Sequence, residues 1–374
     1  MSMTPMSTHT DDQSLLALPF DHYGRYALTR AIVRIIAETA GGALDALDVG
    51  GHSSPLKHFI PEIRVVLSDI EPVGTLTSID FRFDEYVQAS GAALPFRDNA
   101  FPVVTAHDTL EHIPPAFREA FLAELARVAG RFVVLTGPVG DEATVRAEAR
   151  LDSFVRNTLH WDQPFLREHI DLGLPTRASI EEFVQDRGLA FARVANGNIG
   201  RWLSLQALRH YFASLPDSEA LREALDRSYN TRYPEIDGEG ACYRQTYVIA
   251  TTPDGAAALR AIEAAFPPSN ESGGVADIEA LTPMLAALEQ HADGMQEHLK
   301  ALHERIFASE QQAFEFKHGY EELAAQMTER NADLLAARQT IEAQRTEIAR
   351  LRRSLPDKAA RAGRRLWRKL VGRR

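Results

Sequence analysis

The chain of 374 residues is 45% hydrophobic, which is enough for one large domain with an extension or for two domains. Cys242 is its single cysteine, so the sequence excludes an intramolecular disulfide and a four-cysteine metal site. No apolar run reaches membrane-spanning length, and the polar N-terminal residues do not form a signal peptide. We therefore expect a cytoplasmic protein.

The formal net charge of −11 is unevenly distributed along the chain. Residues 350–374 contain 11 Lys and Arg and one acid, a charge of +10. The preceding 349 residues contain 30 basic and 51 acidic residues, a charge of −21. Such an acidic body repels phosphates, which argues against nucleic acid as the main partner.

The N-terminal part of the chain is predicted to be a flexible segment, residues 1–16, followed by an amphipathic helix. Apolar residues at helical spacing, among them Leu28 and Ile32, form one face of this helix. The helix is expected to end at Gly41-Gly42, because glycine is the usual residue just past a helix end.

A nucleotide-binding βαβ unit is predicted next. A short apolar strand, 44–49, leads into the turn Gly50-Gly51-His52-Ser53-Ser54, and a second strand, 64–68, is closed by Asp69. Small residues allow a ligand to approach the backbone, and the acid is placed to accept hydrogen bonds from ribose hydroxyls.

Further alternation of strands and helices predicts an α/β fold, a Rossmann-like doubly wound sheet of seven mostly parallel strands with helical insertions. The last strand is expected to be antiparallel to the sixth. Charged helical segments at 139–177 and 200–230 are the insertions. The other expected strands are 78–88, 101–106, 131–136, 189–194 and 243–250.

The C-terminal part of the chain changes its periodicity. Residues 265–280 have a linker composition, and a long α-helical coiled coil is predicted for 281–355 because apolar residues recur at alternating steps of four and three from Leu288. A lone helix cannot bury that stripe, so we expect a homo-oligomer. Pro356 is expected to end the helix. The domain boundaries are therefore 1–16, 17–264, 265–280, 281–355 and 356–374.

Residues 356–374 form a basic amphipathic tail in which Leu366 and Trp367 share a helical side with flanking Arg and Lys. This pattern is typical of a surface helix on an anionic membrane, which would place the protein at the inner face of that membrane. A solvated basic end or a docking peptide for an acidic protein is the alternative.

The segment 93–104, which begins Ala-Leu-Pro-Phe, runs into a loop that ends Leu110-Glu111-His112-Ile113. Together with the glycine turn and Asp69, it resembles the class I S-adenosylmethionine-dependent methyltransferases of the type 11 group. The resemblance covers roughly residues 20–255 and implies S-adenosyl-L-methionine as the cofactor. The cofactor-binding residues that it implies are Asp48, Gly50, Gly51, His52, Asp69, Ala92, Ala93 and Asp108. It also suggests that Tyr23 or Arg25 covers the methionine end, unless these residues only cap the helix.

The sequence departs from the family pattern at several positions. His52 and Ser54 replace two customary glycines, and Pro102 replaces the usual acid of the fourth strand. Ser90-Gly91-Ala92 stands where an acid often binds the adenine amino group, so the adenine is expected to rely on Ala92 and Ala93.

Three histidines are candidate general bases for a hydroxyl or amine acceptor: His112 in the turn, and His160 and His169 in the first insertion. The alternative for each is a packed or solvent-exposed histidine. Cys242 is expected to be a buried apolar residue. No group of His and Cys has metal-ligand spacing, so no metal is predicted.

The leading hypothesis is an enzyme that transfers a methyl group to a small-molecule or glycan acceptor in bacterial surface-polysaccharide biosynthesis. A scaffold of the same fold that recruits partners through its coiled coil is the alternative. A nicotinamide oxidoreductase is disfavoured, because the three-glycine dinucleotide fingerprint is absent.

Overall fold

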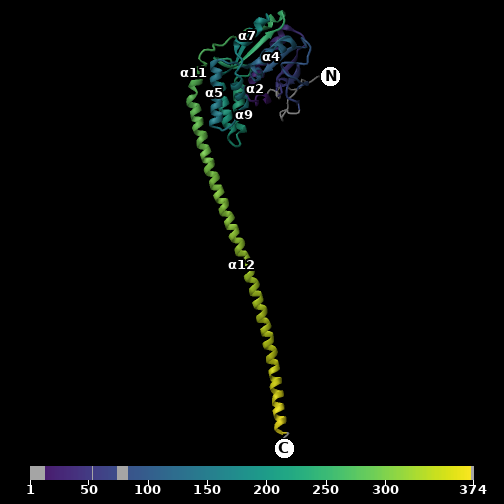
Figure 1. The fold of residues 1–374 in the computed structure, drawn as a ribbon, viewed down its shortest axis with the longest axis vertical. Helices are drawn as coiled ribbons and strands as arrows, with labels where there is room; N and C mark the ends of the chain where they lie inside the picture. Colours follow the sequence, from purple (N-terminus) through teal and green to yellow (C-terminus); the bar gives the residue numbers. More distant parts are fainter. Residues whose placement is uncertain (1–12, 53, 74–82, 372–374) are drawn as a thin grey trace, which may run out of the picture. The chain divides into compact units, whose positions relative to one another are not determined.

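The computed structural model describes residues 13–52, 54–73 and 83–371 (Figure 1). They belong to two compact units, Met1–Gly294 and Met295–Arg374. Within the described ranges, no helix combines the length and the apolar character needed to cross a bilayer.

A seven-stranded sheet of order β3-β2-β1-β4-β5-β7-β6 forms the centre of the first unit. Strands β1 to β5 are parallel to one another, whereas β7 is antiparallel to both β5 and β6. This confirms the predicted sheet, including its antiparallel seventh strand, and differs from the dinucleotide-binding order 3-2-1-4-5-6. The strands are β1 (Asp45–Val49), β2 (Arg64–Asp69), β3 (Glu85–Gln88), β4 (Phe101–His107), β5 (Ala129–Pro138), β6 (Ala190–Asn198) and β7 (Cys242–Ala250). The third strand expected at 78–88 begins only at Glu85, and residues 78–82 lie outside the described part of the chain.

Helices cover both faces of this sheet. One face packs against α2 (Phe20–Ala40), α3 (Leu56–Phe59) and α10 (Ala256–Ala265), and the other against α4 (Pro115–Val128) and α7 (Arg177–Asp186). Within β1, Ala46 belongs to the first cluster and Leu47 to the second, because successive side chains of a strand point to opposite faces. Two short 3₁₀ helices, η2 (Leu110–His112) and η3 (Pro253–Gly255), follow β4 and β7.

The two insertions pack against each other around a third apolar cluster. Their helices are α5 (Glu142–Asn157), α6 (Pro164–Leu172), α8 (Ile199–Ala213) and α9 (Glu219–Arg232). The ring of Trp202 on α8 stacks on that of Tyr243 on β7, with ring centroids 3.8 Å apart. This contact joins the insertions to the sheet.

The expected linker, 265–280, contains a helix, α11 (Gly274–Ala280). Its residue Ile278 is buried in the third cluster, and a Cβ at Gly274 would lie 2.6 Å from that of Ala241. The glycines therefore allow close packing here, whereas their composition had suggested an open linker.

The helix α12 (Thr282–Val371) comprises 90 residues. Its first turns belong to the first unit, where Leu285 is fully buried. The helix continues through residue 356, although proline was expected to end it. The segment Lys358-Ala359-Ala360-Arg361-Ala362 that follows consists of strong helix formers, which favour resumption of the helix beyond a proline.

Candidate functional site

The turn after β1 is fixed by contacts with β2 and with the segment that follows β4. The backbone N–H groups of Gly50 and Gly51 donate to the carbonyl of Ser68 on β2, at 2.8 and 3.4 Å. Gly50 has a φ of 76°, and a Cβ there would lie 2.4 Å from Cγ2 of Thr109. Glycine is therefore needed at this position both for the backbone conformation and for the close approach of Thr109.

Asp48 lies beneath this turn with its side chain 1% exposed. Its Oδ1 accepts a hydrogen bond from the hydroxyl of Thr105 at 2.6 Å and lies 3.1 Å from Nδ1 of His107. Its Oδ2 has no hydrogen-bond partner among the described residues, and a Cβ at Gly51 would lie 3.0 Å from it. The free oxygen thus lies next to the glycine turn, where a cofactor can supply the missing partner.

Asp69 ends β2 beside the same turn. Its Oδ2 accepts from the backbone N–H of His52 and its Oδ1 from that of Glu71, both at 3.0 Å. These two bonds hold the carboxylate in place. Since each carboxylate oxygen can accept more than one hydrogen bond, capacity remains for two ribose hydroxyls.

Ala92 and Ala93 lie in the loop that precedes β4, and Ala93 is exposed. The neighbouring Gly91, which the sequence analysis did not single out, brings this loop close to the end of β1. A Cβ at Gly91 would lie 2.5 Å from the ring of Phe121 and 3.2 Å from the side chain of Val49. The loop backbone is therefore held beside the turn.

Asp108, which the resemblance suggests as a cofactor contact, forms two ion pairs in the structure. Arg25 of α2 and Arg244 of β7 each approach it to 2.6 Å. Burial alone would raise the pKa of Asp108, but these two guanidinium groups hold it well below its usual range. Asp108 has a φ of 46°, in the left-handed region.

The predicted covering residues are also engaged. Arg25 pairs with Asp108, while the hydroxyl of Tyr23 donates to the carbonyl of Pro234 at 3.1 Å. Burial and the nearby Arg25 lower the pKa of His22 to about 4, so this histidine is neutral at pH 7. The role of Arg244 could not be predicted, because nothing in the sequence of a buried strand indicates which acid such an arginine will pair with.

Two of the three candidate histidines lie together. Nε2 of His112, on η2, lies 3.3 Å from Nε2 of His169, on α6. His160 is exposed at the turn before α6, with a φ of 57°. The structure thus groups His112 with His169 and does not place His160 in a described contact with either.

Cys242 is buried, as expected for an apolar role. Burial raises the pKa of its thiol to about 12, so almost no thiolate is present at neutral pH. This environment is that of an inert core cysteine.

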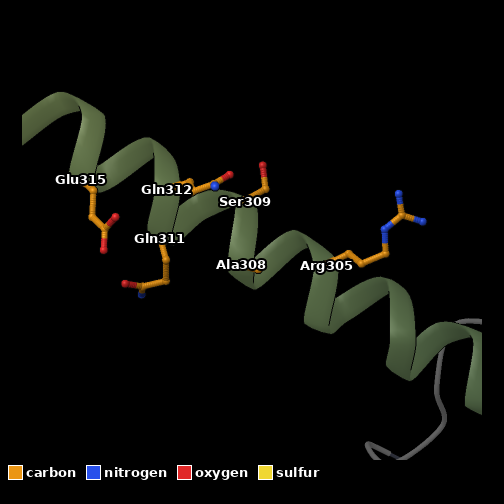
Figure 2. Close-up of a pocket in the computed structure, with 6 residues that line it drawn as sticks. All are labelled: Arg305, Ala308, Ser309, Gln311, Gln312 and Glu315. Atoms are coloured by element: carbon orange, nitrogen blue, oxygen red, sulfur yellow. The ribbon is translucent and has the colours of Figure 1, made fainter.

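Figure 2 shows the side chains around a shallow hollow on α12. Its six residues are Arg305, Ala308, Ser309, Gln311, Gln312 and Glu315. All are exposed and all come from one helix, so among the described residues this surface has no second wall. We assign it no ligand.

Comparison with known proteins agrees with this description of the first unit. Residues 49–133 match the family model described as a methyltransferase domain. This segment runs from the end of β1 into β5 and includes the glycine turn, Asp69 and η2. Together with the sheet order, the match shows that the chain contains a methyltransferase domain of class I. The cofactor of this class is S-adenosylmethionine.

Comparison with solved structures finds distant likenesses. The YcgJ protein of Bacillus subtilis is 14% identical, with a TM-score of 0.36, and the match covers 60% of this chain and 97% of that one. Magnesium protoporphyrin IX methyltransferase of Synechocystis, solved with bound SAH, is 12% identical, with a TM-score of 0.36 and coverage of 67% and 90%. The comparison with curated proteins found no match.

Proposed function

We propose that the first unit transfers the methyl group of S-adenosylmethionine to a hydroxyl- or amine-bearing small molecule or glycan. The observation that carries the donor site is the free Oδ2 of Asp48 beside the Gly50-Gly51 turn, with the fixed carboxylate of Asp69 at the end of the next strand. When bound, the cofactor supplies a methyl group that its sulfonium has already activated.

The residues of the chain then have to bind and align the two reactants. Asp69 would accept the ribose hydroxyls, and Asp48 the donors nearer the methionine end. The backbone of the Gly50-Gly51 turn would contact the cofactor closely, and the loop with Ala92 and Ala93 would pack on the adenine. Alignment of donor and acceptor is expected to provide much of the rate, because an activated methyl group needs little further chemistry.

The acceptor would bind over α5 and α6, the first insertion. Its nearest candidate proton acceptors are His112 and His169, each held through Nδ1 by a carboxylate, Glu168 for the first and Glu148 for the second, at 2.8 Å. Such a pairing orients an imidazole and fixes its tautomer. A surface-glycan precursor made at the inner face of a membrane is the acceptor that we favour, because residues 350–374 carry a charge of +10.

Calorimetry with the full chain tests the donor site. We expect S-adenosylmethionine to bind and NAD not to bind. Asp69→Ala should abolish both this binding and the formation of S-adenosylhomocysteine, whereas Asp186→Ala, at the exposed end of α7, should change neither. Binding of NAD alone, or an unaffected Asp69→Ala variant, would show that this site has another function.

The exposed apolar stripe of α12 supports a further proposal, that two copies of the chain pair along this helix. Apolar positions of the predicted heptads are exposed from Leu299 to Leu351, for example Ile306 at 53% and Leu334 at 62%. A second copy carries the same stripe and can bury it in parallel alignment. The exposed Leu366 and Trp367 near the end of α12 would contact anionic lipid.

A further inference from the structure

Three side chains outside the donor site lie within metal-ligand reach of one another. They are Glu111 and His112, on η2 after β4, and His169, on α6 of the insertion. One ligand atom from each lies within 4.8 Å of the other two. Because 57 residues separate His112 from His169, spacing along the sequence could not reveal the group.

The two imidazoles present the same nitrogen to one another. Nδ1 of His169 lies 2.8 Å from Oε1 of Glu148, which is buried and also accepts from the hydroxyl of Tyr243 at 2.7 Å. Nδ1 of His112 lies 2.8 Å from Oε2 of Glu168. Each carboxylate favours the proton on Nδ1, which leaves two Nε2 lone pairs facing each other at 3.3 Å. A cation between them removes this repulsion, and the carboxylate–histidine pairs are the usual outer contacts of a metal site.

Glu111 supplies the third group. It is 0% exposed, and neither of its carboxylate oxygens has a hydrogen-bond partner among the described residues. A Cβ at Gly137 would lie 3.0 Å from its Oε2, so the glycine leaves room for this carboxylate. A buried carboxylate without a partner is costly unless a cation or a proton neutralises it.

We propose that Glu111, His112 and His169 bind one divalent transition-metal ion, with zinc as the favoured ion. Two imidazole nitrogens and one carboxylate oxygen are the ligand set of open zinc and related sites, whereas magnesium prefers oxygen ligands alone. Three protein ligands leave a coordination position open.

The open position has a use that rests on the proposed function. Thr109, which contacts the turn at Gly50, is two residues from Glu111, so the metal site adjoins the donor site along the chain. An acceptor hydroxyl bound to the ion would become more acidic, which favours a hydroxylated acceptor over an amine. With the ion bound, His112 and His169 serve as ligands and not as the proton acceptors considered above. Binding of the ion itself does not depend on either role.

Metal binding can be measured on the full chain after treatment with a chelator. We expect calorimetry to give one zinc ion per chain, and cobalt(II) to develop the visible absorption of a low-coordinate site. Glu111→Gln and His169→Asn should lose the cobalt spectrum. Glu148→Gln should weaken zinc binding by roughly 10- to 100-fold, because it removes only an outer contact. His160→Asn, an exposed histidine of the same insertion, is the matched control and should bind zinc like the wild type.

Thermal unfolding distinguishes lost binding from lost folding. Zinc should raise the midpoint of the wild type and of His160→Asn, but not that of folded Glu111→Gln. Equal zinc binding by Glu111→Gln and the wild type, or no binding by the folded wild type, would overturn the proposal and leave a proton as the neutralising group. Binding of S-adenosylmethionine is measured on the same samples. A wild type that binds zinc but does not bind S-adenosylmethionine would refute the proposed function and leave the metal site intact.

Discussion

The ion cluster around Asp108 permits a quantitative prediction for Asp108→Asn. The side chains of Asp108, Arg25 and Arg244 are 17%, 10% and 6% exposed, so the three charges are largely removed from water. The substitution leaves two guanidinium groups without their shared carboxylate, and the remaining Asp21 is 3.9 Å from Arg244. Loss of one partner of a buried ion pair lowers the free energy of unfolding by about 3–5 kcal/mol. Because two arginines lose their shared carboxylate here, we expect a value toward the upper end of this range.

Urea unfolding followed by tryptophan fluorescence measures this cost, since Trp202 is buried in the same unit. The matched control is Asp98→Asn, which breaks a pair with Arg127 in which the acid is 72% exposed. We expect the free energy of unfolding of that control to fall by about 0–1 kcal/mol. An Asp108→Asn variant as stable as the control would refute the view that this carboxylate stabilises the fold.

The sign of the pH dependence follows from the same cluster. The pKa of Asp108 is lower in the folded state than in the unfolded state, where it is about 3.8. Asp108 therefore stabilises the fold above that pH, and this contribution to the free energy of unfolding is lost as the pH falls below it. The wild type should therefore lose more stability than Asp108→Asn in acid below that value. If the free energies of unfolding of the two proteins changed in parallel with pH, Asp108 would not be the group responsible.

Four further results are expected. Gly50→Ala should lower the free energy of unfolding by about 1–2 kcal/mol, because residue 50 has a left-handed backbone conformation. The new Cβ would also displace Thr109 and weaken binding of S-adenosylmethionine; unchanged binding in calorimetry would contradict this. The thiol of Cys242, whose pKa is raised to about 12, should react with a disulfide reagent only after unfolding, and rapid reaction of the native protein would show that the strand is accessible. Sedimentation should give a dimer that becomes a monomer when residues 295–374 are deleted, and a monomeric full chain would refute pairing. Trp367→Ala should reduce sedimentation with anionic vesicles but not with neutral ones, and no change would favour a protein partner.

The fold could be predicted largely from the sequence, because its signals are local. The apolar run before Gly50, the acid after the second strand and the alternation of strands and helices define the sheet without long-range information. The structure of residues 265–280 was less predictable, since glycines such as Gly274 occur both in flexible linkers and in tight helix contacts. The end of the helix could not be predicted from Pro356 alone, because the helix-forming residues that follow the proline favour continuation of the helix.

The candidate site was predictable only where a single strand end defines it. Asp48 and Asp69 lie at the ends of two neighbouring strands, so the order of the strands is enough to bring them together. The partners of Asp108 are 83 and 136 residues away along the chain, and no sequence period relates them. Glu111 and His169 likewise become neighbours only because α6 of the insertion packs beside η2.

His107 links the donor site to the N-terminal helix. Its Nδ1 lies next to Asp48 and its Nε2 lies 2.8 Å from the hydroxyl of Thr29 on α2, the helix that also supplies Arg25. Any ligand that binds at Asp48 therefore acts on a carboxylate that α2 helps to hold, and occupancy of the donor site and docking of this helix are thermodynamically linked. Hydrogen exchange in α2 should slow when a ligand occupies the donor site, which makes the helix a reporter of occupancy.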